Sequence, residues 1–430
     1  MGNSLLGSSS GSCFVQLHQI VYSPGDVIEG VIHLMISVPC NITSVELKIS
    51  GKELTYWCER KQETIAEGAG EVRRTRSSDK YYHHHGRRSI CKVRVPVYTA
   101  NGAYLPPGQY SFPFKVQLPA NIPGTFHLND FPGTRRTHGE RFNCTCEYKM
   151  KGIAVVQGML KSNIKHQQML QIVERPPPIV GVAIEDNVQV NICCCLNRGD
   201  FFISMRAEKN AFCGSTGEAV RMVVEMENRT EYDVDTIHME LIQRVRMKAQ
   251  HVQESFESGE YNHKNMRHGW NQYGNHNKTL FKETIAKQET FPGIGQGEVQ
   301  RGDRARLIEM QLVHALEPQC LGYMIECAYF LRVYAYIQCA TNPDVKVPVC
   351  IYAPQPPPQA WQAPQPPPGW NPQILSPTSV TVPSVAAPPS QADFYRGFYA
   401  SAPPMETPIV GQPVAVEMSP GQASQALRSS

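Results

Sequence analysis

The chain has 430 residues, more than one ordinary hydrophobic core holds, which predicts two domains with additional segments. Basic and acidic residues nearly balance, and the formal net charge of +3 gives no argument for nucleic-acid binding. No stretch reaches the roughly 18 uninterrupted apolar residues that a membrane-spanning helix requires. We therefore expect a cytosolic protein whose 14 cysteines are reduced.

The N-terminal residues, MGNSLLGSSSGSC, lack the basic start and apolar middle of a signal peptide. Gly2 suggests N-myristoylation, but Leu6 stands where that motif has serine or threonine. We expect residues 1–12 to form a flexible tail. The GSSSG string at 7–11 matches a nucleophile elbow only formally, because neither a strand before it nor a helix after it is expected. We expect no enzymatic activity and no cofactor.

A turn and a strand open the first predicted domain, residues 13–175. Pro24 and Gly25 suit a turn that requires a positive φ, and apolar residues then alternate with Glu29 and His33. β-Branched and aromatic runs bounded by proline, glycine and asparagine recur through the domain, and no stretch of 12 or more residues has a helical period. This pattern predicts an antiparallel β-sandwich.

Two basic groups in this domain are candidate contacts for phosphates on a cargo tail or for anionic lipid head groups. We expect both in loops, the first beside the three histidines of YYHHHGRR (81–88) and the second after IPGTFHLNDFPG. A solvated charged loop is the simpler interpretation of each, since structural zinc sites draw ligands from spaced positions rather than from adjacent histidines. The first group comprises Arg73, Arg74, Arg76, Lys80, Arg87 and Arg88, and the second comprises Arg135, Arg136 and Arg141.

Prolines 176–178 predict a stiff hinge, residues 176–180, that leads to a second domain, residues 181–353. The opening phrase of the first domain returns there with a shift of 192 residues, so that Gly25 meets Gly217 and Leu34 meets Met226. At a shift of 181 residues, Cys-x-Tyr-x-Met at 146–150 meets Cys-x-Tyr-x-Leu at 327–331. The chain therefore carries a duplicated sandwich rather than a short repeat.

A run of three cysteines, 193–195, has no Cys-x-x-Cys partner in the chain. Adjacent residues of a strand point to opposite faces, so three consecutive thiols do not converge on one metal ion. We expect small buried hydrophobic residues here and no metal site.

From residue 354 the composition becomes rich in proline, serine and alanine, and we expect a disordered tail over 354–430. APQPPPQAW and APQPPPGW form an imperfect repeat whose prolines favour polyproline II and whose tryptophans are apolar anchors. Such strings suit WW-type or other proline-binding domains, and an inert tail is the alternative. The candidate docking residues are Pro357, Pro358, Trp361, Pro367, Pro368 and Trp370.

Four stretches together make the chain resemble the arrestin superfamily and, within it, the alpha-arrestins. They are VYSPGDVIEGVIHL (21–34), LPPGQYSFPFKVQLPANIPGTF (105–126), residues 190–228 with the cysteine run, and GYMIECAYFLRVYA (322–335). The second is similar to the family's signature, with Thr125 in place of a serine. One departure is that the tail lacks the Pro-Pro-x-Tyr motifs through which many alpha-arrestins dock on ubiquitin ligases.

The resemblance implies an all-β protein of two tandem antiparallel immunoglobulin-like β-sandwiches. Family members bind cytoplasmic tails of membrane receptors or transporters and link them to endocytosis, sorting or ubiquitination. We therefore expect a non-enzymatic cytosolic adaptor that is recruited to the plasma membrane or endosomes.

Two alternatives to this adaptor stay open. One is a retromer-like coat subunit with the same two-sandwich plan, and the other is a structural scaffold whose second sandwich only supports the first. A regulated adaptor should need its tail, whereas a coat subunit should bind its partners through the folded domains alone. A scaffold should tolerate charge reversal in both basic groups.

Overall fold

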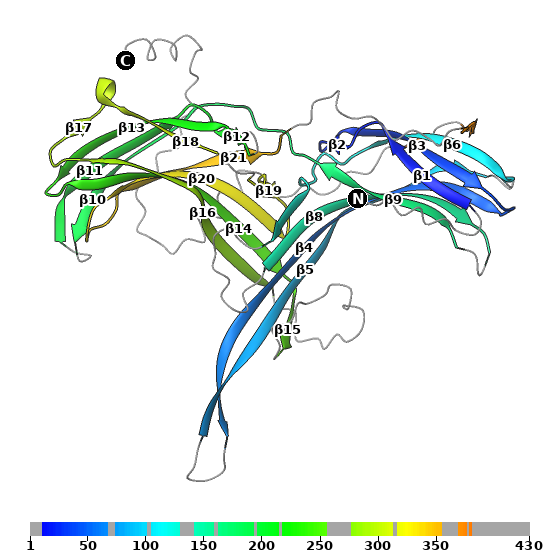
Figure 1. The fold of residues 1–430 in the computed structure, drawn as a ribbon, viewed down its shortest axis with the longest axis horizontal. Helices are drawn as coiled ribbons and strands as arrows, with labels where there is room; N and C mark the ends of the chain where they lie inside the picture. The colour runs from blue at the N-terminus through cyan, green and yellow to red at the C-terminus, as the bar shows by residue number, and fades with distance from the viewer. Residues whose placement is uncertain are drawn as a thin grey trace.

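The computed structural model of the protein describes residues 11–67, 74–100, 105–129, 142–158, 162–192, 196–214, 217–255, 277–312, 316–354, 369–375 and 378–380. These residues contain one 3-10 turn, η2 (Gly302–Arg304), and no α-helix, so none of their helices could span a membrane. Strands form the remaining regular structure and assemble into two sandwiches that meet in the middle of the molecule (Figure 1). The predicted all-β class with two tandem sandwiches is confirmed.

The first sandwich has one sheet in the order β1-β3-β6-β22, with β23 also on β6, and a second in the order β15-β5-β4-β8-β9-β2, with β7 on β8. The first sheet comprises β1 (Gly11–Leu17), β3 (Val27–Ile36), β6 (Gly108–Gln117), β22 (Gln373–Ile374) and β23 (Thr378–Val380). The second comprises β2 (Val21–Tyr22), β4 (Ile42–Glu67), β5 (Arg74–Thr99), β7 (Phe126–Asn129), β8 (Phe142–Val156), β9 (Ile164–Ile172) and β15 (His251–Ser255). Because β15 comes from the second half of the chain, this sheet joins both halves.

The second sandwich has one sheet in the order β10-β11-β13-β17, with β18 on β13, and another in the order β12-β21-β20-β14-β16, with β19 on β20. The first comprises β10 (Val182–Ile192), β11 (Leu196–Ala207), β13 (Ala219–Thr230), β17 (Val299–Gln300) and β18 (Arg306–Gln311). The other comprises β12 (Ala211–Cys213), β14 (Val234–Ala249), β16 (Lys278–Ile294), β19 (Cys320–Leu321), β20 (Ile325–Tyr336) and β21 (Asp344–Tyr352). Residues 174–180 connect the two sandwiches without belonging to a strand, and the domain limits stay a prediction.

The opening turn has the backbone that its sequence predicts. Gly25 has φ of 84° and Gly217, its counterpart in the second half, has φ of 63°. The Asp26 N–H donates to the Ser23 carbonyl over 3.0 Å, and the Asp26 carboxylate accepts the Ser23 N–H over 2.7 Å. β3 begins at the next residue. The predicted turn and strand are confirmed, and glycine suits both positions because a positive φ strains other residues.

Matched residues of the two halves occupy matched places in the core. The Cys-x-Tyr-x-Met segment of β8 and the Cys-x-Tyr-x-Leu segment of β20 have their first, third and fifth side chains fully buried. The hydroxyl of Tyr148 donates to the Pro123 carbonyl over 2.6 Å, and that of Tyr329 donates to the Glu317 carbonyl over 2.7 Å. Each buried tyrosine therefore has the partner that burial of a hydroxyl requires.

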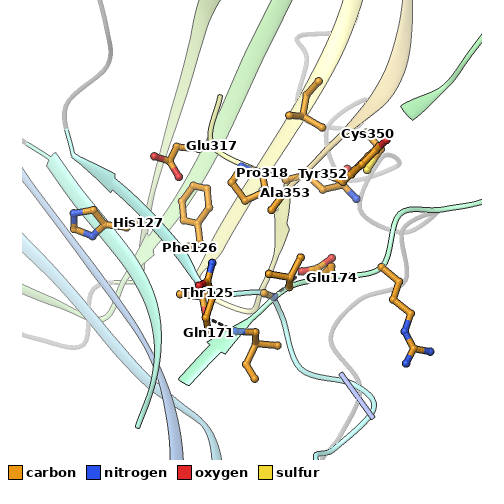
Figure 2. A pocket seen from close by; sticks show the side chains of 16 residues that line it. Thr125, Phe126, His127, Gln171, Glu174, Glu317, Pro318, Cys350, Tyr352 and Ala353 are labelled. Carbon is orange, nitrogen blue, oxygen red and sulfur yellow. Dashed lines mark hydrogen bonds between the residues drawn. The ribbon is translucent and has the colours of Figure 1, made fainter. Parts of the chain in front are cut away.

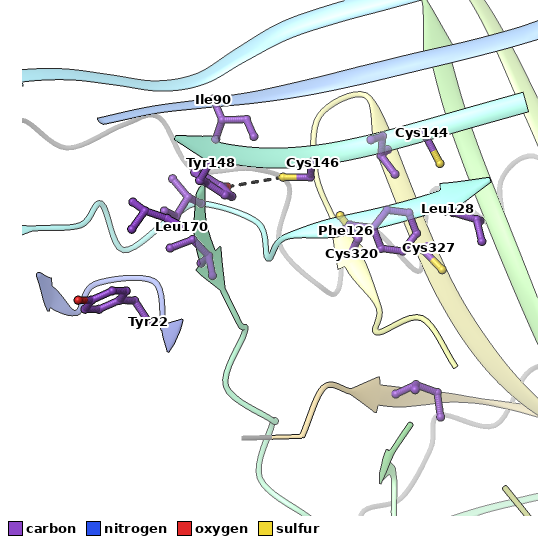
Figure 3. Packing of buried hydrophobic residues seen from close by; sticks show 14 of the residues in the cluster. Tyr22, Ile90, Phe126, Leu128, Cys144, Cys146, Tyr148, Leu170, Cys320 and Cys327 are labelled. Carbon is purple, nitrogen blue, oxygen red and sulfur yellow. Dashed lines mark hydrogen bonds between the residues drawn. The ribbon is translucent and has the colours of Figure 1, made fainter. Parts of the chain in front are cut away.

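The hydrophobic core is continuous across the junction of the two sandwiches. Figure 3 shows Cys144 and Cys146 of the first sandwich near Cys320 and Cys327 of the second, with Phe126 among them. All five side chains belong to one buried cluster that extends through both halves. All of the described cysteines except Cys339 are buried.

The expectation of a loop at the three histidines is wrong. Residues 81–88 belong to β5, which pairs with β4 on one edge and with β15 on the other. His83, His84 and His85 are only 2%, 2% and 6% exposed. The His84 ring stacks on Trp57 at 4.8 Å, and the His83 ring accepts or donates a 3.0 Å hydrogen bond with the Tyr56 hydroxyl. The segment's polar composition indicates a loop, but strands from both halves of the chain cover it.

Candidate functional site

The first basic group is spread along β5 instead of gathered in one loop. Lys80 and Arg88 are eight residues apart, about 26 Å along an extended strand. The Arg88 guanidinium lies 3.9 Å from the centre of the Tyr323 ring, which belongs to the second sandwich. Arg87 and Arg88 are exposed, and Lys80 is half-buried with its amine 5.4 Å from the Tyr82 ring centre. The structure therefore brings Arg88 to the junction and leaves Arg87 on the surface.

Several candidate residues fall outside the described part of the chain. These are Arg73, Arg135, Arg136 and Arg141 of the basic groups, Pro357, Pro358, Trp361, Pro367 and Pro368 of the tail, and the cysteine run 193–195. Arg74 and Arg76 belong to β5, but their side chains are not described. Phosphate or lipid contacts at these positions stay predictions.

A short part of the proline-rich tail adds to the first sandwich. β22 and β23 pair in parallel with β6, and this segment lies beside β6 in Figure 1 (orange). The Leu375 N–H donates to the Ser111 carbonyl over 3.0 Å, and the Asn371 N–H donates to the Gln109 side-chain oxygen over 2.9 Å. Leu375 packs against the hydrophobic core, whereas Ile374 is 71% exposed. The outer edge of β6 therefore holds an extended segment from far along the chain.

Trp370, the candidate anchor of the second proline repeat, contacts the first sandwich. Its ring meets His33 edge-on, with ring centres 5.6 Å apart. His33 is fixed by 2.8 Å hydrogen bonds to the Ser111 hydroxyl and to the Gln16 side-chain oxygen, and its burial lowers its pKa. Trp370 is half-buried in this arrangement. Nothing in the tail's composition predicts this contact, because its proline content indicates disorder.

Glu53 of β4 is the most deeply buried carboxyl at the junction, with no exposed side-chain surface. Its carboxylate accepts the Met324 N–H of the second sandwich over 3.2 Å. Gly322 lies so close that an added Cβ would overlap this carboxyl. Burial raises the pKa of Glu53 to about 7, although backbone N–H groups of the second sandwich and Arg88 partly oppose this rise.

Two further polar contacts cross the junction beside Glu53. The Thr55 hydroxyl donates to the Lys248 carbonyl over 2.6 Å. The Lys278 ammonium pairs with the Glu59 carboxylate at 2.6 Å, and His84 lies 3.5 Å from the same carboxylate. Burial nevertheless lowers the pKa of His84 to about 4. β4 and β5 thus present their polar residues to partners on β14 and β16, and no such partner is evident in the sequence.

A cavity of about 230 Å³ lies where the two sandwiches and the connector meet (Figure 2). Its walls come from residues 124–127, 171–175, 317–319 and 350–353. Sequence analysis did not identify this cavity, because its walls are assembled from four separate parts of the chain. Among the described residues, no group of three histidine, cysteine or acidic side chains is arranged to hold a metal ion.

Comparisons with known proteins agree with this architecture. Residues 14–175 match the domain described as "Arrestin (or S-antigen), N-terminal domain", and residues 197–356 match "Arrestin (or S-antigen), C-terminal domain". The chain is 29% identical over 199 residues to arrestin domain-containing protein A of Dictyostelium discoideum. The match covers 46% of this chain and 32% of that protein, so the chain spans about a third of the relative's length.

Proposed function

We propose that this chain, which belongs to the arrestin family and is of the alpha-arrestin type, is a non-enzymatic adaptor for membrane proteins. It binds cytoplasmic segments of receptors or transporters and links them to endocytosis or sorting. The observation that carries the proposal is the outer edge of β6, which holds an extended segment of the tail.

A sheet edge carries unpaired N–H and C=O groups, so it binds extended peptides through backbone hydrogen bonds. β22 pairs with this edge of β6. Leu375, the residue that follows β22, packs inward, whereas Ile374 points to solvent. An edge that accepts one chain segment in this way suits a cytoplasmic tail of similar pattern. In the proposed adaptor, cargo takes the β6 edge when the protein's own tail leaves it.

The same exchange connects cargo binding to the proline repeats. Trp370 ends the second repeat and packs against His33 while the tail lies on β6. Release of the tail would free Trp370 for a WW-type or other proline-binding domain, for which Pro367 and Pro368 are further candidate contacts. Ubiquitin-ligase recruitment would then follow cargo binding, and the protein would act at the plasma membrane or endosomes. Lys80 and Arg87 remain candidates for contacts with phosphates or anionic lipids.

Affinity capture from detergent-solubilised membranes tests the adaptor function. The baits are the full chain, Leu375→Asp, which buries a charge under the tail strand, and the exposed control Ile374→Asp. We expect mass spectrometry to identify receptors or transporters with all three baits, and several-fold more with Leu375→Asp because its β6 edge is open. A constant set of coat subunits with every bait would instead favour the retromer-like alternative. Enrichment of neither class would contradict the adaptor function and leave the scaffold.

A further inference from the structure

We infer that the cavity at the junction of the two sandwiches binds an organic cation, an alkylammonium or guanidinium group on a short stem. Its volume of about 230 Å³ lies below the roughly 300–1,000 Å³ of sites for drug-sized ligands, so it suits one side chain or a small amine. Both sandwiches and the connector contribute to its walls.

Glu174, Glu317 and Gln319 bring acceptor oxygens to the cavity wall. Glu174 and Glu317 lie on different parts of the wall (Figure 2). The Glu174 carboxylate accepts the Gly124 N–H over 2.8 Å, and burial raises the pKa of both carboxyls. Gln319 is only 9% exposed, and its side-chain oxygen is buried without a hydrogen-bond partner among the described residues. A buried acceptor that lacks a donor is costly, which favours a ligand rich in N–H groups.

The cations of the wall do not neutralise these carboxylates. Arg175 is 71% exposed, and its guanidinium pairs with Asp26 at 2.5 Å. The Nε2 atom of His127 forms a 2.6 Å hydrogen bond with the side-chain nitrogen of Asn129. The His127 ring is exposed, and its charge only partly offsets the rise in the pKa of Glu317 that burial causes. The described wall holds no other histidine, lysine or arginine. Half-buried carboxylates without a close cation, as at Glu174 and Glu317, are stabilised by a ligand that supplies one.

The remaining wall suits the stem of such a ligand. Phe126 and Tyr352 provide aromatic surface, and Ile351 and Ala353 add apolar surface. Lysine and arginine side chains bury their stems along apolar surface in this way, and cations are attracted to aromatic faces. The expected ligand therefore has a head group rich in N–H donors and an apolar stem.

A basic side chain of a bound partner is one source of this cation, and a free small amine is the other. Cytoplasmic segments of membrane proteins carry an excess of lysine and arginine, which favours the side chain. Only this choice of source rests on the proposed adaptor function. The site itself is tested with small molecules, without any cargo.

The test is calorimetric titration of the full chain with butylguanidinium and with butylurea, its neutral analogue of the same shape. We expect saturable binding of butylguanidinium only. Glu317→Gln should weaken it about tenfold or more, because a charge-assisted hydrogen bond is lost, whereas Glu185→Gln, at an exposed position on β10, should leave it unchanged. Equal binding of butylurea, absence of saturable binding, or unchanged affinity in Glu317→Gln would overturn the inference.

A second variant and a peptide pair complete the experiment. Gln319→Met keeps the side-chain volume, removes the unpartnered oxygen, and should weaken binding even if Glu317→Gln fails to fold. Acetyl-Gly-Arg-Gly-amide is compared with the same peptide carrying citrulline, the neutral analogue of arginine. Binding of the arginine peptide that depends on Glu317 assigns the source to a side chain, and binding of butylguanidinium alone assigns it to a free amine. Membrane capture can fail while butylguanidinium binds, or succeed while it does not, so the two proposals are separable.

Discussion

Glu53 lies on the same face of β4 as the buried Leu47 and Ile49, so a period of two points this charged residue inward. The structure keeps this alternation: Glu53 is fully buried and Leu54 is only half-buried. The register shift between Gly51 and Lys52 in the pairing of β4 with β5 adds a residue to β5 and leaves the alternation of β4 unbroken. From there on, the inward side chains meet backbone N–H and C=O groups of β14 and the turn before β20.

Glu53 should make the stability of the protein depend on pH. Its pKa of about 7 in the folded protein exceeds its usual 4.5, so the folded state binds the proton more tightly than the unfolded state. The free energy of unfolding should therefore fall as pH rises from about 4.5 to 7, by on the order of 3 kcal/mol from this group. Glu53→Gln should lack this loss, which denaturant unfolding at pH 5 and pH 8 measures.

The control for this prediction is the exposed Glu185→Gln, which should keep the pH dependence of the unmodified protein. Other groups also titrate in this range, so the quantity compared is the difference in slope between variants. Equal slopes for Glu53→Gln and the unmodified protein would show that the carboxyl is ionised without cost in the folded state.

At the scale of elements, β5 and the tail strand differ from what the sequence indicates for the same reason. The YYHHHGRR segment shows no apolar alternation, and the tail is rich in proline, so each by itself indicates irregular structure. Each pairs instead with strands distant in the chain: β5 with β15, and β22 with β6. Sheet pairing is decided by backbone hydrogen bonds, which any sequence with free N–H groups can form.

The tail segment packs inward through Leu375. The half-buried Leu375 packs against the core, and replacing it with aspartate should release the tail, because part of the about 1.5–3 kcal/mol that a fully buried leucine contributes is lost. We expect hydrogen exchange across residues 369–380 to accelerate roughly tenfold in Leu375→Asp.

Ile374→Asp is the matched control. The Ile374 side chain is 71% exposed, so its replacement should change the exchange rate little. Similar exchange in both variants would mean that the leucine does not hold the strand. Backbone hydrogen bonds and Trp370 would then account for the contact.

At the scale of the whole molecule, the two sandwiches share structure instead of merely lying next to each other. One hydrophobic cluster runs through both, and β15 of the second half completes a sheet of the first. Buried polar contacts at Glu53 and Thr55 add to this junction. Two domains joined in this way should lose their structure together, because opening the junction exposes apolar surface and unpaired polar groups.

We therefore predict a single unfolding transition for both sandwiches. Hydrogen exchange at β8 and at β20, followed by mass spectrometry in increasing urea, should report the same midpoint. Gly86→Ala should separate the two midpoints, because a Cβ at this position would overlap the Thr55 hydroxyl and the Lys248 carbonyl. Gly108→Ala, where the nearest atom to the new Cβ is 3.5 Å away, is the control. Separate midpoints in the unmodified protein would contradict the shared core.

The sequence by itself determined the all-β class, the duplication, the opening turns at Gly25 and Gly217, and the buried alternation of β8. These features are local, since turn chemistry and a period of two depend on neighbouring residues. Only the tertiary structure decided the burial of the histidines, the partners of Glu53, the pairing of the tail with β6, and the cavity between the sandwiches. Each of these depends on segments more than a hundred residues apart, and no local pattern encodes which distant segment covers a polar one.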